Sequence, residues 1–243
     1  MKQSFFTVTS NNALTNDVYQ MTLTGDTSGI KCGQFVNIKV DGFYLRRPIS
    51  VCDVVGDVLT LVYKVVGGGT EAMSKMPVGT QLDLLTQLGN GYDVNATQNH
   101  AVLLGGGVGV PPLYRLCKDL VALGKKVTVI LGFNTQSEIF YQKQFADLGA
   151  TVYVTTVDGS YGTKGYVTDA LKLVDNYDYF YTCGPEPMLK AVYNATTTSG
   201  QFSFEERMGC GFGACMGCSC ETKYKTLRIC KEGPVLTKEI IVW

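Results

Sequence analysis

Three cysteines near the end of the chain follow the spacing C-x4-C-x2-C, and a fourth comes after a gap that suits a hairpin. Three thiolates on a short, glycine-rich loop and one distant thiolate are the ligands that a [2Fe–2S] cluster of the plant-ferredoxin kind requires. The spacing therefore predicts a one-electron carrier, which needs one group that delivers electrons and another that accepts them. The four cysteines are Cys210, Cys215, Cys218 and Cys230.

A structural zinc site is the alternative for this loop. Zinc sites usually pair two C-x2-4-C knuckles, which an x4 gap, an x2 gap and a lone fourth cysteine fit less well. Cys220, two residues beyond Cys218, complicates the assignment; we expect it to leave the loop along a strand and Cys230 to be the fourth ligand. Four glycines permit the backbone angles that wrap N–H groups around sulfur. They are Gly209, Gly211, Gly213 and Gly217.

The composition is that of a globular protein without a charge signature. The chain has 243 residues, 45% of them apolar, which is enough for one large core or two smaller ones. Lys and Arg number 21, as do Asp and Glu, so no net field favours nucleic acid or an anionic membrane surface. The single histidine, His100, excludes a Rieske centre, which needs two histidine ligands. We expect it to be a surface residue at the foot of a strand.

The N-terminus and the use of cysteine predict a cytoplasmic protein. The first residues lack the apolar core and cleavage site of a signal peptide, and no apolar run is long enough to span a bilayer. Nine cysteines in a reducing compartment stay as thiols, so a metal role explains the terminal group better than disulfides do. We expect Cys32, Cys52 and Cys117 to be small core residues.

The elements that must position these residues fall into three segments. Residues 1–98 contain short strands separated by turn residues, which predict an antiparallel β-barrel. In residues 99–201 strands alternate with helices, which predicts a doubly wound α/β parallel sheet. Residues 202–243 are too few to hold a core, so we expect this cysteine-rich segment to depend on its metal. The expected strands of the barrel include 5–10, 18–24, 34–40, 48–53 and 58–66, and the expected helices of the sheet include 113–123, 139–148 and 167–173.

Two glycine turns follow strands of the predicted parallel sheet. The first consists of Gly105, Gly106, Gly107, Val108 and Gly109 and leads into a helix at Pro111 and Pro112. The second is Cys183-Gly184-Pro185. Because doubly wound sheets bind ligands at their carboxyl edge, the two turns predict one nucleotide crevice, with helix N–H groups facing phosphate. The first turn departs from G-x-G-x-x-G, and a plain tight turn is the alternative.

The barrel segment offers a candidate site for a pyrophosphate. Arg46 and Arg47, followed by Pro48-Ile49-Ser50, combine cations with a hydroxyl group. The glycines at 67–69 precede Thr70 at the start of a short helical stretch, whose N-terminus suits a second phosphate. The alternatives are solvated surface arginines and a threonine that only caps the helix.

In this order the three segments are similar to the ferredoxin–NADP reductase superfamily, in which an FAD-binding barrel precedes a nicotinamide-binding domain. More narrowly, the chain resembles the electron-transfer subunits of type 1B dihydroorotate dehydrogenases, a family of pyrimidine biosynthesis. The stretches that carry this resemblance are Arg47-Pro48-Ile49-Ser50, Gly105 through Leu113, Asp158-Gly159-Ser160-Tyr161-Gly162, Cys183-Gly184-Pro185, and Glu206 through Cys218.

The resemblance implies FAD, a [2Fe–2S] cluster and NAD as an exchangeable substrate. It also implies a catalytic partner subunit that holds FMN and oxidises dihydroorotate to orotate while NAD is reduced, in a heterotetramer with two copies of each subunit. Carried over by position, the flavin contacts fall on Arg47, Pro48, Ile49, Ser50, Val62, Tyr63, Lys64, Gly69 and Thr70, and the cluster ligands on Cys210, Cys215, Cys218 and Cys230.

The cysteine segment departs from the pattern of that family at two points. The gap between Cys218 and Cys230 is shorter than the family leads us to expect, and Cys220 is extra. The fourth ligand is therefore Cys230 with Cys220 as the alternative. In the nucleotide segment, no basic pair follows Gly132-Phe133-Asn134, which favours NAD over NADP.

These patterns predict an oxidoreductase subunit whose substrate chemistry lies in its partner. A nicotinamide passes two electrons as hydride and an iron–sulfur cluster accepts one, so a flavin must stand between them. No acid or base of this chain is needed for the hydride transfer. Two alternatives stay open: a reductase subunit for another acceptor, in a bifurcating or oxygenase complex, and a nonenzymatic nucleotide-binding module with structural zinc.

Overall fold

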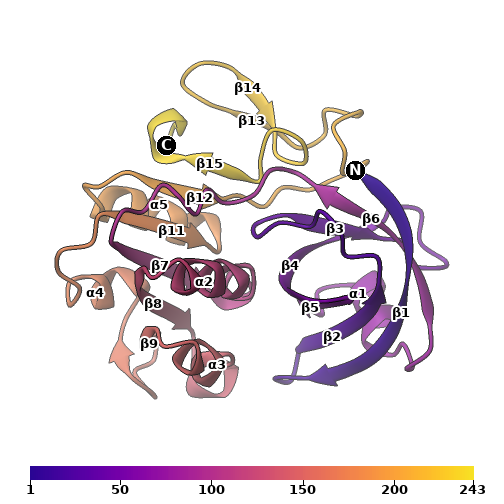
Figure 1. Cartoon of the computed structure of the whole chain (residues 1–243), viewed down its shortest axis with the longest axis horizontal. Coiled ribbons are helices and arrows are strands. Elements are labelled where there is room, and N and C mark those ends of the chain that lie inside the picture. The colour runs from indigo at the N-terminus through magenta and orange to yellow at the C-terminus, as the bar shows by residue number, and fades with distance from the viewer.

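The N-terminal strands close into a six-stranded antiparallel barrel in the computed structural model, which describes residues 1–243 (Figure 1). The strand order around the barrel is β1-β2-β5-β4-β3-β6. Alternate residues point inward, as the pleat of a strand requires, and fill the interior with side chains such as Phe6, Met21 and Leu61. The elements are β1 (Lys2–Ala13), β2 (Val18–Gly25), β3 (Phe35–Ile38), β4 (Arg47–Val55), β5 (Val58–Lys64), α1 (Gly68–Ser74) and β6 (Gln81–Leu88).

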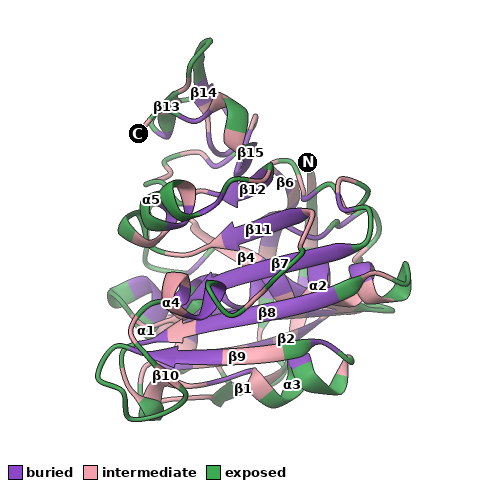
Figure 2. Cartoon of the chain, turned by 90° about the vertical axis from the view of Figure 1, so that its left-hand side faces the viewer, coloured by how far each residue is buried: buried purple, intermediate pink, exposed green.

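Seven strands of the rest of the chain form one sheet, of order β10-β9-β8-β7-β11-β12-β15. Neighbouring strands are parallel except β15, which runs antiparallel to β12. The central strands are buried along most of their length, because helices cover both faces (Figure 2). The strands are β7 (His100–Gly106), β8 (Lys126–Phe133), β9 (Thr151–Thr156), β10 (Thr163–Lys164), β11 (Tyr179–Cys183), β12 (Gly200–Ser203) and β15 (Val235–Thr237).

The helices divide between the two faces of this sheet, which makes it doubly wound. Apolar side chains of α2 and α3 pack in one core and those of α4 and α5 in the other. Proline at the start of α2 suits the first turn, where its missing N–H needs no partner. None of the helices has the length and apolar character to cross a membrane. The helices are α2 (Pro112–Ala122), α3 (Gln142–Asp147), α4 (Val167–Leu171) and α5 (Glu186–Ala195), with short 3₁₀ turns η1 (Gly107–Gly109), η2 (Gln136–Glu138) and η3 (Lys238–Ile240).

The C-terminal segment is fastened to the parallel sheet at both of its ends. It leaves from β12 and returns as β15, and the two strands pair from Ser203 with Val235 to Gln201 with Thr237. Between them lies the hairpin of β13 (Ser219–Glu221) and β14 (Thr226–Arg228), above the sheet in Figure 1. The domain boundary that we predict between residues 201 and 202 falls inside β12.

One helix of the sheet begins later than the sequence predicts. We expect a helix over 139–148, but α3 begins only at Gln142, because Ile139 is extended and Tyr141 has a φ of 65°. The reason is aromatic packing: Phe140 is in edge contact with Phe133, and Tyr141 with Tyr114. Burial of both rings in the same core outweighs the continuation of the helix.

The expectation that His100 is a surface residue is wrong. The side chain is buried at the start of β7, where its Nε2 lies 2.9 Å from the Thr128 hydroxyl and its Nδ1 3.3 Å from the carbonyl of Asn176. Burial, and then the nearby charge of Lys126, lower the pKa of His100. A buried histidine whose ring is bonded to β8 and to the loop before β11 has a structural role, and no sequence pattern separates it from an exposed one. The buried positions of Cys32, Cys52 and Cys117 are as expected.

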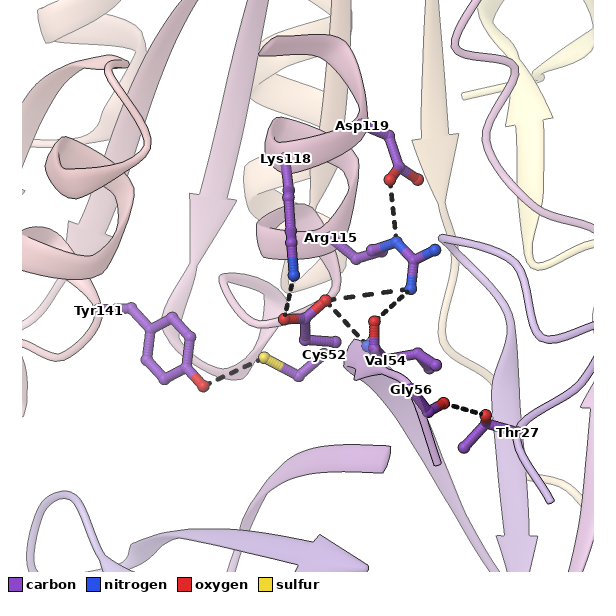
Figure 3. Close-up of polar contacts among 9 residues, drawn as sticks. Thr27, Cys52, Val54, Gly56, Arg115, Lys118, Asp119 and Tyr141 are labelled. Atoms are coloured by element: carbon purple, nitrogen blue, oxygen red, sulfur yellow. Dashed lines mark hydrogen bonds and ion pairs between the residues drawn. The ribbon is translucent and has the colours of Figure 1, made fainter. Parts of the chain in front are cut away.

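The barrel and the parallel sheet meet where β4 faces α2 (Figure 3). The pairing of β4 with β5 shifts register between Val51 and Asp53, and such a bulge re-aims the side chains around it. Asp53 Oδ2 lies 2.9 Å from Lys118 Nζ, and Arg115 donates to the carbonyl of Val54 at 3.0 Å. These contacts link the strand that carries the barrel's arginine motif to the helix that follows the first glycine turn.

Candidate functional site

The hairpin brings two of the predicted cluster ligands together. Ile229 N–H donates to the carbonyl of Cys218 at 3.0 Å, and Cys230 N–H donates to Cys218 Sγ at 3.4 Å. Cys218 and Cys230 are buried, whereas Cys220 is half-buried on β13 with its thiol 3.6 Å from the carbonyl of Glu221. The structure therefore places Cys230 beside Cys218 and directs Cys220 elsewhere. That Cys230 is the fourth ligand stays a prediction.

The cluster loop, residues 209–218, carries Cys210 and Cys215 ahead of Cys218, and its backbone turns N–H groups toward the sulfurs of these two cysteines. Ala214 N–H donates to Cys210 Sγ at 3.2 Å, and Gly217 N–H donates to Cys215 Sγ at 3.4 Å. Gly211 and Gly213 have φ values of 78° and 91°, which favour glycine. This wrapping is the reason for the density of glycine in the loop.

The pKa values of the loop thiols respond to these contacts. Burial raises the pKa of Cys210, but N–H donors from Phe212, Cys215 and Ala214 outweigh it and bring the pKa to about 6. Burial, together with the neighbouring Cys218 and Cys210, raises the pKa of Cys230 to about 12. Thiolate is the form that binds metal, so a bound metal would displace the proton that Cys230 otherwise retains.

The thiols fit a two-iron cluster better than a single ion. They lie in two pairs, Cys210 with Cys215 and Cys218 with Cys230, and a [2Fe–2S] cluster takes two thiolates at each iron. N–H donors aimed at sulfur also suit a cluster, whose sulfurs accept hydrogen bonds.

The two glycine turns meet at the carboxyl ends of adjacent strands. Gly105 of β7 is in register with Cys183 of β11, and the backbone of Gly109 packs so closely on Cys183 and Gly184 that no Cβ would fit there. At Gly106 a Cβ would approach the sulfur of Met188 to 2.5 Å, so this side chain would have to shift to make room for it. Gly107, with a φ of 52°, has open space where its Cβ would be. Open backbone thus lies at the edge of the sheet where a nucleotide is predicted, beside Pro185 at the start of α5; that these turns bind a nucleotide stays a prediction.

An acidic residue that the strand pattern does not predict, Glu138, lies at the neighbouring strand end. After β8 the 3₁₀ turn η2 folds back, so that Asn134 donates to Glu138 Oε2 from its backbone N–H at 3.2 Å and from Nδ2 at 2.9 Å. The next loop joins it, because Gln136 N–H donates to Ser160 Oγ at 2.8 Å. Asn134 is the residue that directly follows β8, whereas Glu138 comes at the end of the turn. The residues next to the strand therefore do not indicate that a carboxylate lies there.

The two neighbouring arginines of the barrel motif have different surroundings. Arg46 forms a two-pronged ion pair with Asp83 of β6, at 2.8 and 3.1 Å, and also donates to the carbonyl of that residue. Arg47 lies over the ring of Phe43, 4.7 Å from its centroid, and covers Gly69 so closely that a Cβ there would clash with the guanidinium. Of the two, Arg47 is the cation that faces the first turn of α1.

The remaining predicted flavin contacts lie near this turn, but several side chains are already engaged. Thr70 Oγ1 accepts from Val66 N–H at 3.0 Å and from Gly67 N–H at 3.2 Å, so the hydroxyl fastens the loop before α1. Tyr63 points into the barrel and donates to Asn11. Lys64 pairs with Asp17 at 3.0 Å on the surface. On β4, Ile49 packs on the barrel core, whereas Pro48 and Ser50 alternate to the outside, as Val62 does on β5.

Comparisons with known proteins agree with this arrangement. Residues 205–242 match the model of the iron–sulfur cluster binding domain of dihydroorotate dehydrogenase B, and residues 103–194 match the oxidoreductase NAD-binding domain. The electron transfer subunit of dihydroorotate dehydrogenase B (NAD(+)) from Fusobacterium nucleatum is 44% identical over 97% of this chain and 96% of its own. That from Bacillus pumilus is 42% identical over 98% of both chains.

The chain belongs to the family of dihydroorotate dehydrogenase B electron transfer subunits. Among solved structures, an NADH-dependent reduced ferredoxin–NADP oxidoreductase, described in connection with flavin-based electron bifurcation, covers 98% of this chain and 90% of its own with a TM-score of 0.90 and 27% identity. The barrel, the doubly wound sheet and the cysteine-rich segment are therefore the architecture expected for this oxidoreductase family.

Proposed function

We propose that this chain relays electrons between NAD and the FMN of a catalytic partner subunit that oxidises dihydroorotate to orotate in pyrimidine biosynthesis. One observation carries the proposal: the chain is similar to named electron transfer subunits over nearly its whole length, including the cysteine segment. The three redox groups would be FAD on the barrel, NAD at the glycine turns and a [2Fe–2S] cluster in the cluster loop.

The chain's own residues have to bind, orient and separate these groups. A flavin supplies the change from two-electron hydride to single electrons when it is bound. Arg47, placed over Gly69, would neutralise the pyrophosphate of FAD beside the first turn of α1, where helix N–H groups lack intrahelical partners. The turn at Gly107 would admit the dinucleotide backbone. Hydride transfer needs no acid or base from this chain, and the proton chemistry on dihydroorotate belongs to the partner.

Within the nicotinamide site, the position of Glu138 supports NAD over NADP. A carboxylate at the end of the second strand of a nucleotide fold suits the 2′-hydroxyl of NAD and repels the 2′-phosphate of NADP. Glu138 is held at the end of β8 by Asn134, and no arginine or lysine stands in the turn from Asn134 to Glu138. The absence of a basic pair and the presence of the carboxylate point the same way.

The name of the family implies a catalytic partner subunit. The exposed part of the cluster loop indicates the surface on which this partner would bind. Cys215 and Met216 are exposed, whereas Cys218 and Cys230 are buried toward the sheet, so the partner would approach the Cys215 side. We propose an FMN-containing catalytic subunit and a heterotetramer with two copies of each chain. Nine free thiols suit the reducing cytoplasm, and the balanced charge favours neither nucleic acid nor a membrane as partner.

A reductase subunit for another acceptor is the second candidate. The bifurcating oxidoreductase with a TM-score of 0.90 has the same plan over nearly the whole chain, at 27% identity. The higher identity to dihydroorotate dehydrogenase subunits, 44%, favours the first candidate. Co-expression with the catalytic subunit separates the two, because only the first gives a complex that reduces NAD with dihydroorotate.

EPR and visible absorption of the anaerobically purified chain test the proposal, with iron and sulfide counted in the same sample. Addition of NADH should bleach a flavin band and produce the rhombic S = 1/2 signal of a reduced [2Fe–2S] cluster. A colourless protein that contains zinc would exclude the relay and leave the cysteine loop with a structural role.

The variant Cys215→Ser tests the order of the relay, with Cys220→Ser as its matched control in the same segment. In Cys215→Ser, NADH should still reduce the flavin at close to the normal rate, whereas electron delivery to the partner should stop. Cys220→Ser should keep both steps, since its thiol points away from the paired cysteines. Full delivery by Cys215→Ser would contradict a path through the cluster.

A further inference from the structure

Asn37 of β3 lies on the outer face of the barrel beside the flavin motif. Its neighbours Val36 and Ile38 point into the barrel core, so the side chain of Asn37 points outward. It is nevertheless buried, because the cluster loop covers it. In the pairing of β3 with β4, Asn37 stands opposite Pro48. This one residue is therefore adjacent both to the strand predicted to bind flavin and to the loop predicted to bind the cluster.

The two ends of the Asn37 amide differ in their bonding. Nδ2 donates to the carbonyl of Cys210 at 3.2 Å. Oδ1 is buried and has no hydrogen-bond partner. The cluster loop is shaped around this contact, because Gly211, with a φ of 78°, has no room for a Cβ beside Nδ2. Arg46 also donates to the backbone carbonyl of Asn37 at 3.4 Å. A hollow of about 420 Å³ lies between the barrel and the cluster loop and is lined by Arg46 and Cys210.

The chemistry of the neighbouring groups decides which of them can satisfy Oδ1. A buried acceptor without a donor destabilises the protein, so native structures nearly always supply one. The sulfurs of a cluster are acceptors and cannot donate to an amide oxygen. A flavin carries a ring N–H and ribityl hydroxyl groups, and its predicted strand is the one paired with β3. Of the two cofactors that the proposed function brings to this place, only the flavin can be the donor.

We propose that Asn37 bridges the two cofactors: its Oδ1 accepts a hydrogen bond from the flavin, and its Nδ2 holds the Cys210 carbonyl of the cluster loop. It is a flavin-binding residue and, through Cys210, a positioning residue for the cluster. The inference rests on the proposed function, since it needs both groups. Its consequence is that flavin and cluster are held at a fixed separation by one side chain, which is what transfer of single electrons between them requires.

Two substitutions separate the two halves of this bridge. Asn37→Leu removes both hydrogen bonds at nearly constant volume, whereas Asn37→Asp keeps an acceptor for the flavin and removes the donor to Cys210. The matched control is Asn12→Leu, at an exposed position on β1 of the same barrel. The measurements are the affinity for FAD after its removal, the EPR line shape of the cluster reduced with dithionite, and the rate of cluster reduction after mixing with NADH.

For Asn37→Leu we expect FAD affinity to fall about fivefold to tenfold, the value of one hydrogen bond. The EPR line shape should change, and cluster reduction by NADH should slow about tenfold or more, as for other residues that orient metal ligands. Asn37→Asp should keep the FAD affinity within about twofold and still show the altered cluster signals. Circular dichroism and the Tm check that both variants fold. If Asn37→Leu does not fold, Asn37→Asp still tests the contact between Asn37 and the cluster loop.

Unchanged FAD affinity in a folded Asn37→Leu variant would mean that water satisfies Oδ1 and would overturn the flavin half of the bridge. Unchanged cluster signals in both variants would overturn the cluster half. The wild-type chain separates these outcomes from failure of the proposed function: if NADH does not reduce its flavin and cluster, the relay itself is wrong, whatever the variants do.

Discussion

Arg46 and Arg47 are neighbours in sequence, yet the structure gives them different tasks. The Arg46 guanidinium lowers the pKa of Asp83 through its hydrogen bonds, and both side chains are largely buried. Arg47 instead faces α1 and forms no ion pair. We therefore expect substitution of the first arginine to affect stability and substitution of the second to affect flavin binding.

The variant Arg47→Ala should lower FAD affinity without a large change in Tm. A hydrogen bond to a charged group contributes about 2 kcal/mol, which corresponds to about thirtyfold in affinity. The matched control, Arg46→Ala, should retain FAD but unfold with about 1–2 kcal/mol less free energy, since it leaves Asp83 partly buried without its cation. Equal flavin content in Arg47→Ala and the wild type would remove Arg47 from the flavin site.

Single residues can be identified from the sequence when they belong to a short motif whose members act together. The cysteine spacing and the Arg47-Pro48-Ile49-Ser50 motif are of this kind. Asp83, the partner of Arg46, lies 37 residues away along the chain, and the contact of Asn37 with Cys210 joins residues 173 apart. Such pairs depend on the closing of the barrel and the return of the cluster loop. They cannot be predicted from local sequence patterns.

Among the elements, the C-terminal segment combines two parts of different stability. The strands β12 and β15 belong to the parallel sheet, and their residues Phe202 and Leu236 are in its core. The hairpin of β13 and β14 has only three residues in each strand, and a two-stranded hairpin is marginal by itself. The prediction that this whole segment depends on its metal therefore applies to the hairpin and the cluster loop, since β12 and β15 have the sheet to pair with.

Removal of the cluster should loosen the segment between residues 204 and 230 and leave β12 and β15 in place. Hydrogen exchange of the chain with and without cluster, or of a variant with serine at the four ligand positions, measures this directly. We expect the amides of β13 and β14 to exchange at least about tenfold faster without cluster, whereas those of β12 and β15 keep their protection. Equal loss of protection in all four strands would show that the sheet edge also depends on the metal.

The type and order of the elements are largely predictable from the sequence, but their ends are not. Alternating strands and helices after residue 99 predict the doubly wound sheet because its central strands are mostly apolar, as in Ala101–Leu104. The late start of α3, after Tyr141, comes from the packing of this ring on Tyr114 of α2, which is a tertiary contact. The position of β15 at the sheet edge likewise depends on antiparallel pairing with β12, not on its own three residues.

For the whole molecule, function requires that the barrel and the sheet keep one relative position. The flavin motif is on β4, and the nicotinamide turn leads into α2, so hydride transfer depends on the contact between these two elements. Polar contacts dominate its edge: Asp53 with Lys118, Arg115 with Val54, and the Cys52 thiol 3.3 Å from the hydroxyl of Tyr141 (Figure 3). The ion pair of Asp53 and Lys118 is the part of this contact that single substitutions can remove without opening a core cavity.

The variants Asp53→Asn and Lys118→Met should slow flavin reduction by NADH about tenfold or more, because a displacement of about 1 Å between reacting groups far from the substitution is sufficient for such a loss. If the two residues act through each other, the double variant should be little slower than either single one.

Lys143→Met is the matched control, since Lys143 pairs with Asp147 at 2.6 Å on the exposed side of α3. The readouts are the stopped-flow rate, the charge-transfer absorbance of the flavin with NAD, and the Tm. A lower Tm with an unchanged rate and charge-transfer band would mean that the ion pair only stabilises the fold, and that apolar packing between β4 and α2 sets the position of the two nucleotide sites.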